Sequence, residues 1–263
     1  MYDVKQKLQE AYQDWGTAFD VDGFMFDLTN KLELHGFHRN DSRLVFSVCS
    51  DDLNRLSDRI TIENALVKHY NSEFHLGTLG AYPIAGVTGL AAASHHVPDM
   101  IEHGKSVEGN LIIFASPHVG AVLANSNTYG KVVRPGQERE TTCCGAMMGF
   151  LKKLKESKSS KELKGNAGDA IDVAKNTLFS EMFGSHSAEL DGLLGLKDEN
   201  KQVIELSKIN HLLVVKRIKE IVNVFSHANK FEGKIVLVSG ITINTSQEDY
   251  FISKEVTILK GKD

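Results

Sequence analysis

The sequence predicts an α/β fold with a central sheet flanked by helices, and two apolar segments carry that prediction. Residues 43–49 read RLVFSVC and residues 111–115 read LIIFA. Short apolar runs of this kind are typical of buried strands. The first run ends in Cys49 and the second is followed closely by His118. Each strand would therefore bring a potential metal ligand to the edge where open α/β sheets bind their ligands.

The other predicted elements follow from periodicity and turn residues. Amphipathic segments at 2–15 and 19–35 predict a helical N-terminal extension (about 1–36), which ends at Gly36. Asp51 and Asp52 would open a helix that reaches about residue 69. Further helices are predicted at about 145–156, 168–184 and 199–228, and strands at 234–238, 241–243 and 251–259.

The composition fits a single globular domain over residues 1–263. Hydrophobic residues make up 41% of the 263 positions and charged residues 24%, which is enough to bury a large core. The Lys-, Ser- and Gly-rich stretch at about 157–168 predicts an exposed linker between two helices rather than a domain boundary.

Charge and hydropathy favour a small-molecule substrate. The formal net charge is -4, so the basic footprint of a nucleic-acid-binding protein is missing. Apolar runs stay far short of the roughly 18–20 residues that a membrane helix needs. The polar start of the chain lacks the apolar region of a secretory signal. We therefore expect a cytoplasmic protein that binds neither nucleic acid nor a membrane.

The first candidate site lies where the first predicted strand ends. Cys49 is followed by Asp51 and Asp52, and by Arg55 one helical turn later. The chain has three cysteines, an odd count that favours reduced thiols in the cytoplasm. Taken alone, this segment is more typical of a buried cysteine followed by helix-capping aspartates than of a metal site.

The second candidate site follows the second predicted strand. Pro117 before His118 and Gly120 after it predict a sharp turn that would fix the imidazole at the sheet edge. A histidine that merely hydrogen-bonds within a turn would give the same pattern.

The third candidate site is the pair Cys143 and Cys144, which precedes Gly145 and a predicted helix. The amides at a helix N-terminus favour a thiolate. Adjacent cysteines cannot easily bind one ion together, so we expect one to be a ligand and the other to pack. A vicinal disulfide is the redox alternative.

Two thiolates and one imidazole make up the ligand set of a catalytic zinc site. Sulfur and nitrogen donors suit Zn²⁺, and three protein ligands leave the fourth tetrahedral position for water. A closed structural site would need one more Cys or His, which His95 or His96 could supply. An open site is therefore an inference from the residue types.

Several motifs together resemble one family. Residues 80–90 read GAYPIAGVTGL and residues 93–99 read ASHHVPD, in a chain that also has Cys-x-Asp, Pro-His and Cys-Cys-Gly. From about residue 24 to residue 150 the sequence resembles the limiting-CO2-inducible protein B family, the theta-class carbonic anhydrases, which are related to the beta class.

The resemblance implies a fold, an assembly and a ligand set. The fold would be a beta-carbonic-anhydrase-like central sheet flanked by helices, and the protein would assemble as a homodimer. Zn²⁺ would be bound by Cys49, His118 and Cys144, which match the family's two cysteines and histidine. Cys144 is preferred to Cys143 because the beta-class ligand cysteine is followed directly by glycine, as Cys144 is by Gly145.

Two departures separate this chain from ordinary beta-class enzymes. Those enzymes place the histidine and the second cysteine only a few residues apart, whereas His118 and Cys144 are 26 positions apart. Where the beta class has an arginine paired with its aspartate, this chain has Leu53. Arg55 is the nearest substitute and Arg59 lies a turn further, so the usual Asp-Arg pair is in doubt.

The function implied is the reversible hydration of CO2 to bicarbonate by a zinc-bound hydroxide. Asp51 would orient that hydroxide, and Arg55 would keep Asp51 ionised and away from the metal. His95, His96 and Tyr82 are candidates for proton transfer or for lining the pocket. The alternative for the histidine pair is a structural role.

Two other functions stay open at this point. The first is a catalytically inactive zinc-containing homologue that acts as a structural or inorganic-carbon-binding subunit. The second is a redox protein that uses Cys143 and Cys144 without a metal.

Overall fold

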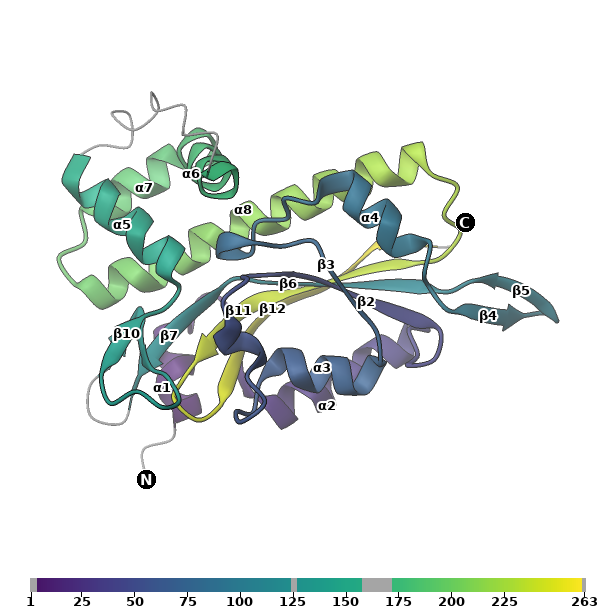
Figure 1. Ribbon diagram of the computed structural model, residues 1–263, viewed down its shortest axis with the longest axis horizontal. Coiled ribbons are helices and arrows are strands. Elements are labelled where there is room, and N and C mark those ends of the chain that lie inside the picture. The colour runs from purple at the N-terminus through teal and green to yellow at the C-terminus, as the bar shows by residue number, and fades with distance from the viewer. Residues whose placement is uncertain (1–3, 124–126, 158–171, 262–263) are drawn as a thin grey trace.

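A mixed sheet of eight strands runs through the computed structural model, which describes residues 4–123, 127–157 and 172–261 (Figure 1). The main path has the order β1-β12-β11-β6-β2-β3, and β7 pairs with both β11 and β8. The strands are β1 (Thr17–Asp20), β2 (Ser42–Val48), β3 (Glu73–His75), β6 (Asn110–Ser116), β7 (His118–Val122), β8 (Thr128–Tyr129), β11 (Ile235–Asn244) and β12 (Asp249–Lys260). β3, β2, β6, β11 and β7 form the parallel part, whereas β12, β1 and β8 pair antiparallel.

The apolar sequences of β2 and β6 explain their central place. Strands of a parallel sheet are buried on both faces, so they need apolar side chains on both. In β2, Leu44 and Phe46 contact one apolar cluster and Val45 contacts another on the opposite face. This alternation is the two-residue period of a strand. The two strands predicted at 43–49 and 111–115 are confirmed.

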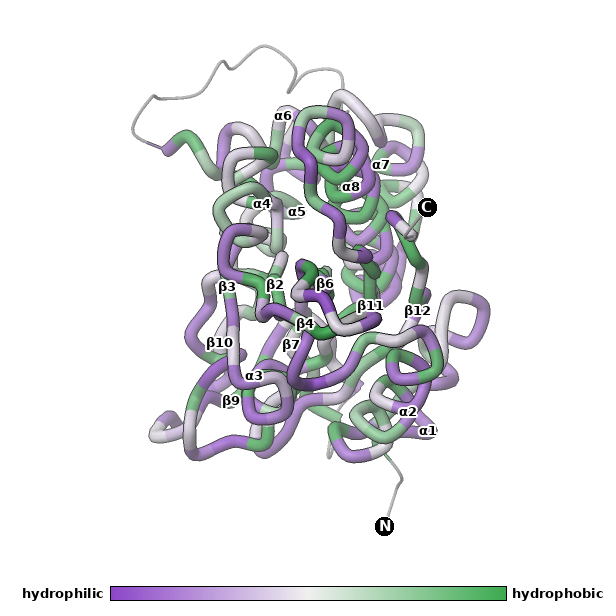
Figure 2. The backbone as a smooth tube through the Cα atoms, turned by 90° about the vertical axis from the view of Figure 1, so that its right-hand side faces the viewer, coloured by the Kyte–Doolittle hydropathy of each residue, from purple (hydrophilic) through white to green (hydrophobic). Residues whose placement is uncertain are grey.

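Helices cover both faces of the sheet (Figures 1 and 2). One face carries α4 (Gly86–Ser94) and the long α8 (Glu199–Ala228), and α5 (Gly145–Ser157), α6 (Val173–Ser185) and α7 (Ser187–Leu194) gather around one end of α8. The other face carries α2 (Val21–Leu34) and α3 (Ile62–Tyr70), and α1 (Val4–Ala11) lies near β7. Within the described ranges, we find no helix that is long and apolar enough to cross a membrane.

The remaining elements are short. Two antiparallel hairpins stand apart from the main sheet, β4 (Asp99–Glu102) with β5 (Lys105–Glu108), and β9 (Lys131–Val133) with β10 (Glu140–Thr142). Two 3₁₀ turns, η1 (Asp52–Arg55) and η2 (Leu79–Ala81), follow β2 and β3.

The two helices predicted in the N-terminal extension are confirmed by α1 and α2, but a short strand, β1, lies between them and was not predicted. β1 pairs with β12 from Thr17 opposite Ser253 to Asp20 opposite Tyr250. The Asp20 carboxylate then accepts a hydrogen bond from Gly23 N and so begins α2. The partner strand lies more than two hundred residues away, so nothing local in the sequence marks this strand.

Other predicted boundaries shift for similar reasons. The helix expected from Asp52 to about residue 69 is divided into η1 and α3, because the Thr61 side chain caps a new helix at Asn64 N. The strands expected at 234–238 and 241–243 are one strand, β11, whose pairing with β12 shifts register at Ser239 and Gly240. α5 and α8 confirm two predicted helices, and α6 matches the third from residue 173 on. The expected linker lies outside the described residues beyond Ser157.

The sharp turn predicted at Pro117 is also wrong. β6 and β7 run one after the other along the same strand, β11, with Ala115 opposite Ser239 and His118 opposite Thr242. Pro117 has no N–H, but its carbonyl oxygen accepts a hydrogen bond from Thr242 N at 3.0 Å. The proline therefore interrupts the pairing without turning the chain, and His118 enters the sheet as the first residue of β7.

Candidate metal centre

Three predicted ligands meet at the carboxyl ends of the parallel strands. Cys49 directly follows β2, His118 begins β7, and Cys144 directly precedes α5. Their ligand atoms lie within 4.8 Å of one another, and the Cys49 and Cys144 Sγ atoms are 3.6 Å apart. All three residues are at most 3% exposed. The arrangement has the donors and the separations of a metal site.

The segment between β7 and α5 explains how Cys144 lies close to His118 although 26 positions separate them in the sequence. After β7 the chain forms the β9–β10 hairpin and then returns to β7. There Gly120 N donates to the carbonyl oxygen of Cys143 at 2.9 Å. A Cβ atom on Gly120 would lie 2.6 Å from the carbonyl oxygen of Lys131. Glycine is therefore required where the hairpin packs against β7.

Cys143 contacts His118 at its Nδ1 nitrogen. Its Sγ lies 3.5 Å from His118 Nδ1 and 3.4 Å from Asn244 Oδ1. Nδ1 already has a hydrogen bond of 2.6 Å to Asn244 Oδ1, whereas Nε2 is buried and has no hydrogen-bond partner. Asp51, His118 and Cys143 also lie within 4.8 Å of one another, so a ligand set with Cys143 is the alternative to the one with Cys144.

The thiols and the imidazole are electrostatically coupled. The hydrogen bond from Cys144 lowers the pKa of Cys49 to about 4 although burial opposes this change. The same bond and burial raise the pKa of Cys144. Burial lowers the pKa of His118, but the neighbouring cysteine sulfurs raise it more strongly. A bound metal ion would displace protons from this cluster, because thiolates and neutral imidazole are the binding forms.

Asp51 lies beside the cluster and is bound by Arg134. The guanidinium donates to both carboxylate oxygens, to Oδ1 at 2.9 Å and to Oδ2 at 2.7 Å. Burial raises the pKa of Asp51, but the bonds and charge of Arg134, the charge of His118 and the bond from Leu53 N together outweigh it, and the pKa falls to about 2. Asp51 Oδ2 is 4.0 Å from His118 Nε2. An ionised carboxylate is thus fixed next to the three candidate ligands.

The arginines expected from the sequence have other partners. Arg55 Nε lies 3.6 Å from Glu63 Oε2, and Arg59 forms a buried ion pair with Asp249 at 2.9 Å. The predicted Asp51–Arg55 pair is therefore wrong. The η1 turn after Asp51 carries residue 55 toward α3 instead. Arg134 was missed because it lies 83 positions from Asp51 and its only local mark is the Pro-Gly turn after it.

The proposed proton-transfer residues lie in two different places. His95 and His96 are exposed at the end of α4, and the His96 carbonyl accepts a hydrogen bond from Arg43 at the start of β2. Because Cys49 follows the other end of β2, the two histidines lie roughly 20 Å from the cluster within this chain. Tyr82 is buried in the apolar cluster that includes Cys49 and Cys144.

A small buried cavity adjoins His118 and Cys144. Five further residues of its wall are apolar and two, both from α8, are polar. They are Val119, Met147, Met148, Val203 and Leu206, with Ser207 and Asn210. The surroundings of the cluster on this side are therefore mainly apolar.

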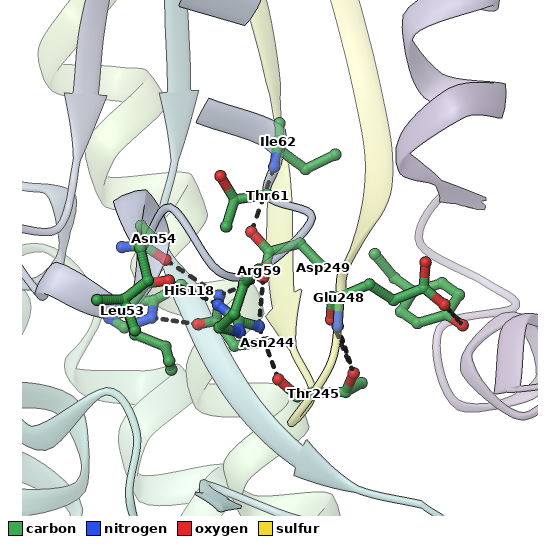
Figure 3. A network of polar contacts seen from close by, with 12 residues as sticks. Leu53, Asn54, Arg59, Thr61, Ile62, His118, Asn244, Thr245, Glu248 and Asp249 are labelled. Carbon is green, nitrogen blue, oxygen red and sulfur yellow. Dashed lines mark hydrogen bonds and ion pairs between the residues drawn. The ribbon is translucent and has the colours of Figure 1, made fainter. Parts of the chain in front are cut away.

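A buried polar network supports the cluster from the sheet side (Figure 3). Asn244 connects His118 to Asp249, which accepts hydrogen bonds from Arg59 Nη2 and Ile62 N. Arg59 also donates to the Leu53 carbonyl at 2.6 Å, in the segment that follows Asp51. The Asp249 carboxylate thus accepts from three donors, Arg59 Nη2, Ile62 N and Asn244 Nδ2; burial raises its pKa, and these bonds and the charge of Arg59 oppose that rise.

Removing Asp249 should strongly destabilise the fold. Asp249→Ala leaves the Arg59 guanidinium buried without its partner, which typically costs about 3–5 kcal/mol. Denaturant unfolding would measure the change. As a control, Asp27→Ala breaks a surface ion pair with Lys31 and should cost less than about 1 kcal/mol. Equal effects of the two substitutions would contradict a structural role for the buried pair.

Glu63 should make stability depend on pH. Burial raises the pKa of Glu63 to about 8, and Arg55 only partly opposes the rise from 4.5. The folded protein therefore keeps a proton that the unfolded chain releases, and the free energy of unfolding should fall as the pH rises from 4.5 to 8. Unfolding curves across this range should be flatter for Glu63→Gln, whereas the exposed control Glu138→Gln should follow the parent protein.

Comparisons with known proteins agree with this fold. The crystal structure of PtLCIB4, a homolog of the limiting CO2-inducible protein LCIB, aligns over 96% of this chain and 94% of its own, with a TM-score of 0.75 and 22% identity. The crystal structure of the limiting CO2-inducible protein LCIB aligns over 98% of this chain and 96% of its own, with a TM-score of 0.71 and 13% identity. At such identities the likeness shows the fold alone.

The family assignment comes from the sequence. No curated protein matches the chain significantly. The model of the limiting CO2-inducible proteins B/C beta carbonic anhydrases matches residues 18–260, which is most of the chain and includes all three candidate ligands. The chain therefore belongs to the limiting CO2-inducible protein B/C family of beta carbonic anhydrases.

Proposed function

We propose that this protein is a carbonic anhydrase, a zinc lyase that catalyses the reversible hydration of CO2 to bicarbonate. Cys49, His118 and Cys144 would hold one Zn²⁺. The observation that carries the proposal is the Asp51 carboxylate, which lies 4.0 Å from His118 Nε2 while Arg134 binds both of its oxygens. Asp51 Oδ1 also caps η1 by accepting from Leu53 N at 3.1 Å, but that bond does not involve Oδ2, the oxygen that lies beside His118.

The ligand atoms fit zinc in number, type and spacing. Zn–S bonds of about 2.3 Å in a tetrahedron put two sulfurs about 3.8 Å apart. The Cys49 and Cys144 Sγ atoms are 3.6 Å apart. His118 Nε2 is a buried nitrogen without a hydrogen-bond partner, as a nitrogen reserved for a metal should be. Soft sulfur and nitrogen donors select against Mg²⁺ and Ca²⁺, which prefer oxygen.

A zinc ion bound here would lower the pKa of its coordinated water to about 7 and so supply hydroxide at neutral pH. Asp51 is ionised there and can only accept hydrogen bonds, so it would orient the attacking oxygen by accepting its hydrogen. The two bonds from Arg134 hold both carboxylate oxygens, so they would keep Asp51 from becoming a ligand itself.

Substrate contact would come from the apolar side of the cluster. CO2 has no net charge, and apolar side chains such as Val119, Met147 and Leu206 line the cavity next to His118; its volume of about 10 Å³ holds about one water-sized molecule, so it would have to widen to admit CO2. A charged product is held less well by such a wall than by water, which favours release of bicarbonate. The homodimer and the cytoplasmic location stay predictions from the sequence.

Metal removal tests this function directly. Purified protein should contain about one zinc per chain, and stopped-flow CO2 hydration should disappear after chelation and return when zinc is added. Zinc binding without hydration would support the inactive structural or inorganic-carbon-binding homologue instead. Thiol-dependent redox activity without metal would support the third function and contradict both zinc proposals.

A further inference from the structure

The hydrogen bonds of Asn244 fix the orientation of its side-chain amide. Asn244 is the last residue of β11 and is fully buried. Its Nδ2 donates to Asp249 Oδ1 at 2.9 Å and to Asn54 Oδ1 at 3.1 Å. Its Oδ1 lies 2.6 Å from His118 Nδ1 and also accepts a hydrogen bond from the Cys143 thiol. Both amide hydrogens and the oxygen are thus engaged.

The two groups that accept hydrogen bonds from Asn244 Nδ2 cannot act as donors instead. The Asp249 carboxylate accepts from Arg59 Nη2 and from Ile62 N and has no hydrogen of its own to give. Asn54 uses its own Nδ2 to donate to the Cys49 carbonyl at 3.3 Å, so its oxygen is what faces Asn244. A flipped Asn244 would set its oxygen against a buried carboxylate. The orientation therefore follows from the charge of the Arg59–Asp249 pair.

The fixed amide determines which nitrogen of His118 carries hydrogen. Asn244 Oδ1 can only accept, so the hydrogen bond of 2.6 Å requires a hydrogen on His118 Nδ1. The other ring nitrogen, Nε2, has no hydrogen-bond partner and lies on the side of Asp51. In histidine ligands the second ring nitrogen usually fixes the ring in this way.

We propose that Asn244 is a positioning residue, oriented by the Arg59–Asp249 pair, that keeps hydrogen on His118 Nδ1 and leaves Nε2 as the metal-binding nitrogen. The inference rests on the proposed metal site. It assigns a role to Arg59 and Asp249, whose side chains, within the described residues, form no hydrogen bond to the three candidate ligands.

The amide suits this position better than a carboxylate would. An aspartate at residue 244 would place a second carboxylate within hydrogen-bond distance of Asp249, and burying two such charges side by side is costly. Asn244 is oriented by the Arg59–Asp249 pair and in turn orients the His118 ring, and it adds no charge next to His118. The sheet side of the cluster thus stays neutral toward the ligand histidine.

Two metal-binding measurements on the intact protein test the proposal. Protein with ¹⁵N-labelled histidine and bound ¹¹³Cd should show coupling between the metal and Nε2 of His118, with a slowly exchanging hydrogen on Nδ1. Asn244→Ala should raise the zinc dissociation constant by about 10–100-fold, the usual effect of losing such a partner. The control Asn110→Ala removes another fully buried asparagine, which lies at the start of β6 and donates to the Gly36 carbonyl, so its dissociation constant should stay close to that of the parent.

Coupling of the metal to Nδ1 in the parent protein would overturn the proposal, as would equal zinc affinities for Asn244→Ala and Asn110→Ala. If Asn244→Ala does not fold, the coupling in the parent protein still decides. None of these readouts uses CO2 hydration. A zinc-loaded protein that passes both but does not hydrate CO2 would refute the proposed function and leave the role of Asn244 intact.

Discussion

Replacing Cys144 by alanine is expected to remove zinc and all CO2 hydration above the uncatalysed rate, whereas Cys143→Ala should keep both. The Cys144 thiol lies 3.6 Å from Cys49 Sγ, inside the proposed ligand set. The Cys143 thiol instead contacts Nδ1 of His118 and the oxygen of Asn244, on the nitrogen that is already hydrogen-bonded.

Zinc per chain and stopped-flow hydration rates would be measured on both variants. Cys49→Ala and His118→Ala are expected to behave like Cys144→Ala, because each removes one of three ligands. Full zinc content in the Cys144 variant together with its loss in the Cys143 variant would instead favour the set of Asp51, His118 and Cys143.

Arg134→Ala should abolish most hydration while zinc stays bound. Without the two guanidinium bonds, Asp51 is free to turn toward the metal and close the open position. We expect a loss of about 10²–10⁴-fold in rate, the range for a positioned proton-accepting group. Losing the opposite charge should also raise the pKa of Asp51 by roughly 1–3 units and shift the pH profile of the rate. Arg134→Lys should restore only part of the rate, since a point charge cannot bind both oxygens in the same way.

Arg55→Ala is the matched control, because Arg55 pairs with Glu63 and not with Asp51. Its rate and pH profile should match those of the parent protein. Asp51→Ala should reproduce the Arg134→Ala loss with zinc retained. A dead Arg55 variant beside an active Arg134 variant would contradict the pairing described above.

Local sequence could predict that Cys49, His118 and Cys144 lie close together because each lies next to a segment with a strong local signal. The runs at 43–49 and 111–115 are apolar enough to be central strands, and polar residues at their ends must lie at the sheet edge. The choice of Cys144 came from the family resemblance, through the glycine that follows it. No comparable signal surrounds Arg134, which reaches Asp51 only after the β9–β10 hairpin has formed.

The rest could not be predicted because it depends on partners far away in the chain. β1 exists through pairing with β12, and Asn244 reaches Asn54 across 190 positions. Proline usually ends a strand, but at Pro117 the chain continues in the same direction because β6 and β7 both pair with β11. His95 and His96 were attractive because of their residue type, but α4 ends far from the cluster. Their residue type suggested proton transfer, but within this chain they lie at the opposite end of β2 from Cys49.

The most direct test of the proposed centre is a crystal structure of the zinc-loaded protein with anomalous diffraction measured at the zinc absorption edge. We expect one strong peak per chain, bonded to Cys49 Sγ, His118 Nε2 and Cys144 Sγ, with water at the fourth position and Asp51 still bound to Arg134. A peak bonded to Cys143 or to the Asp51 carboxylate, or no peak at this cluster, would contradict an open zinc centre made by these three ligands.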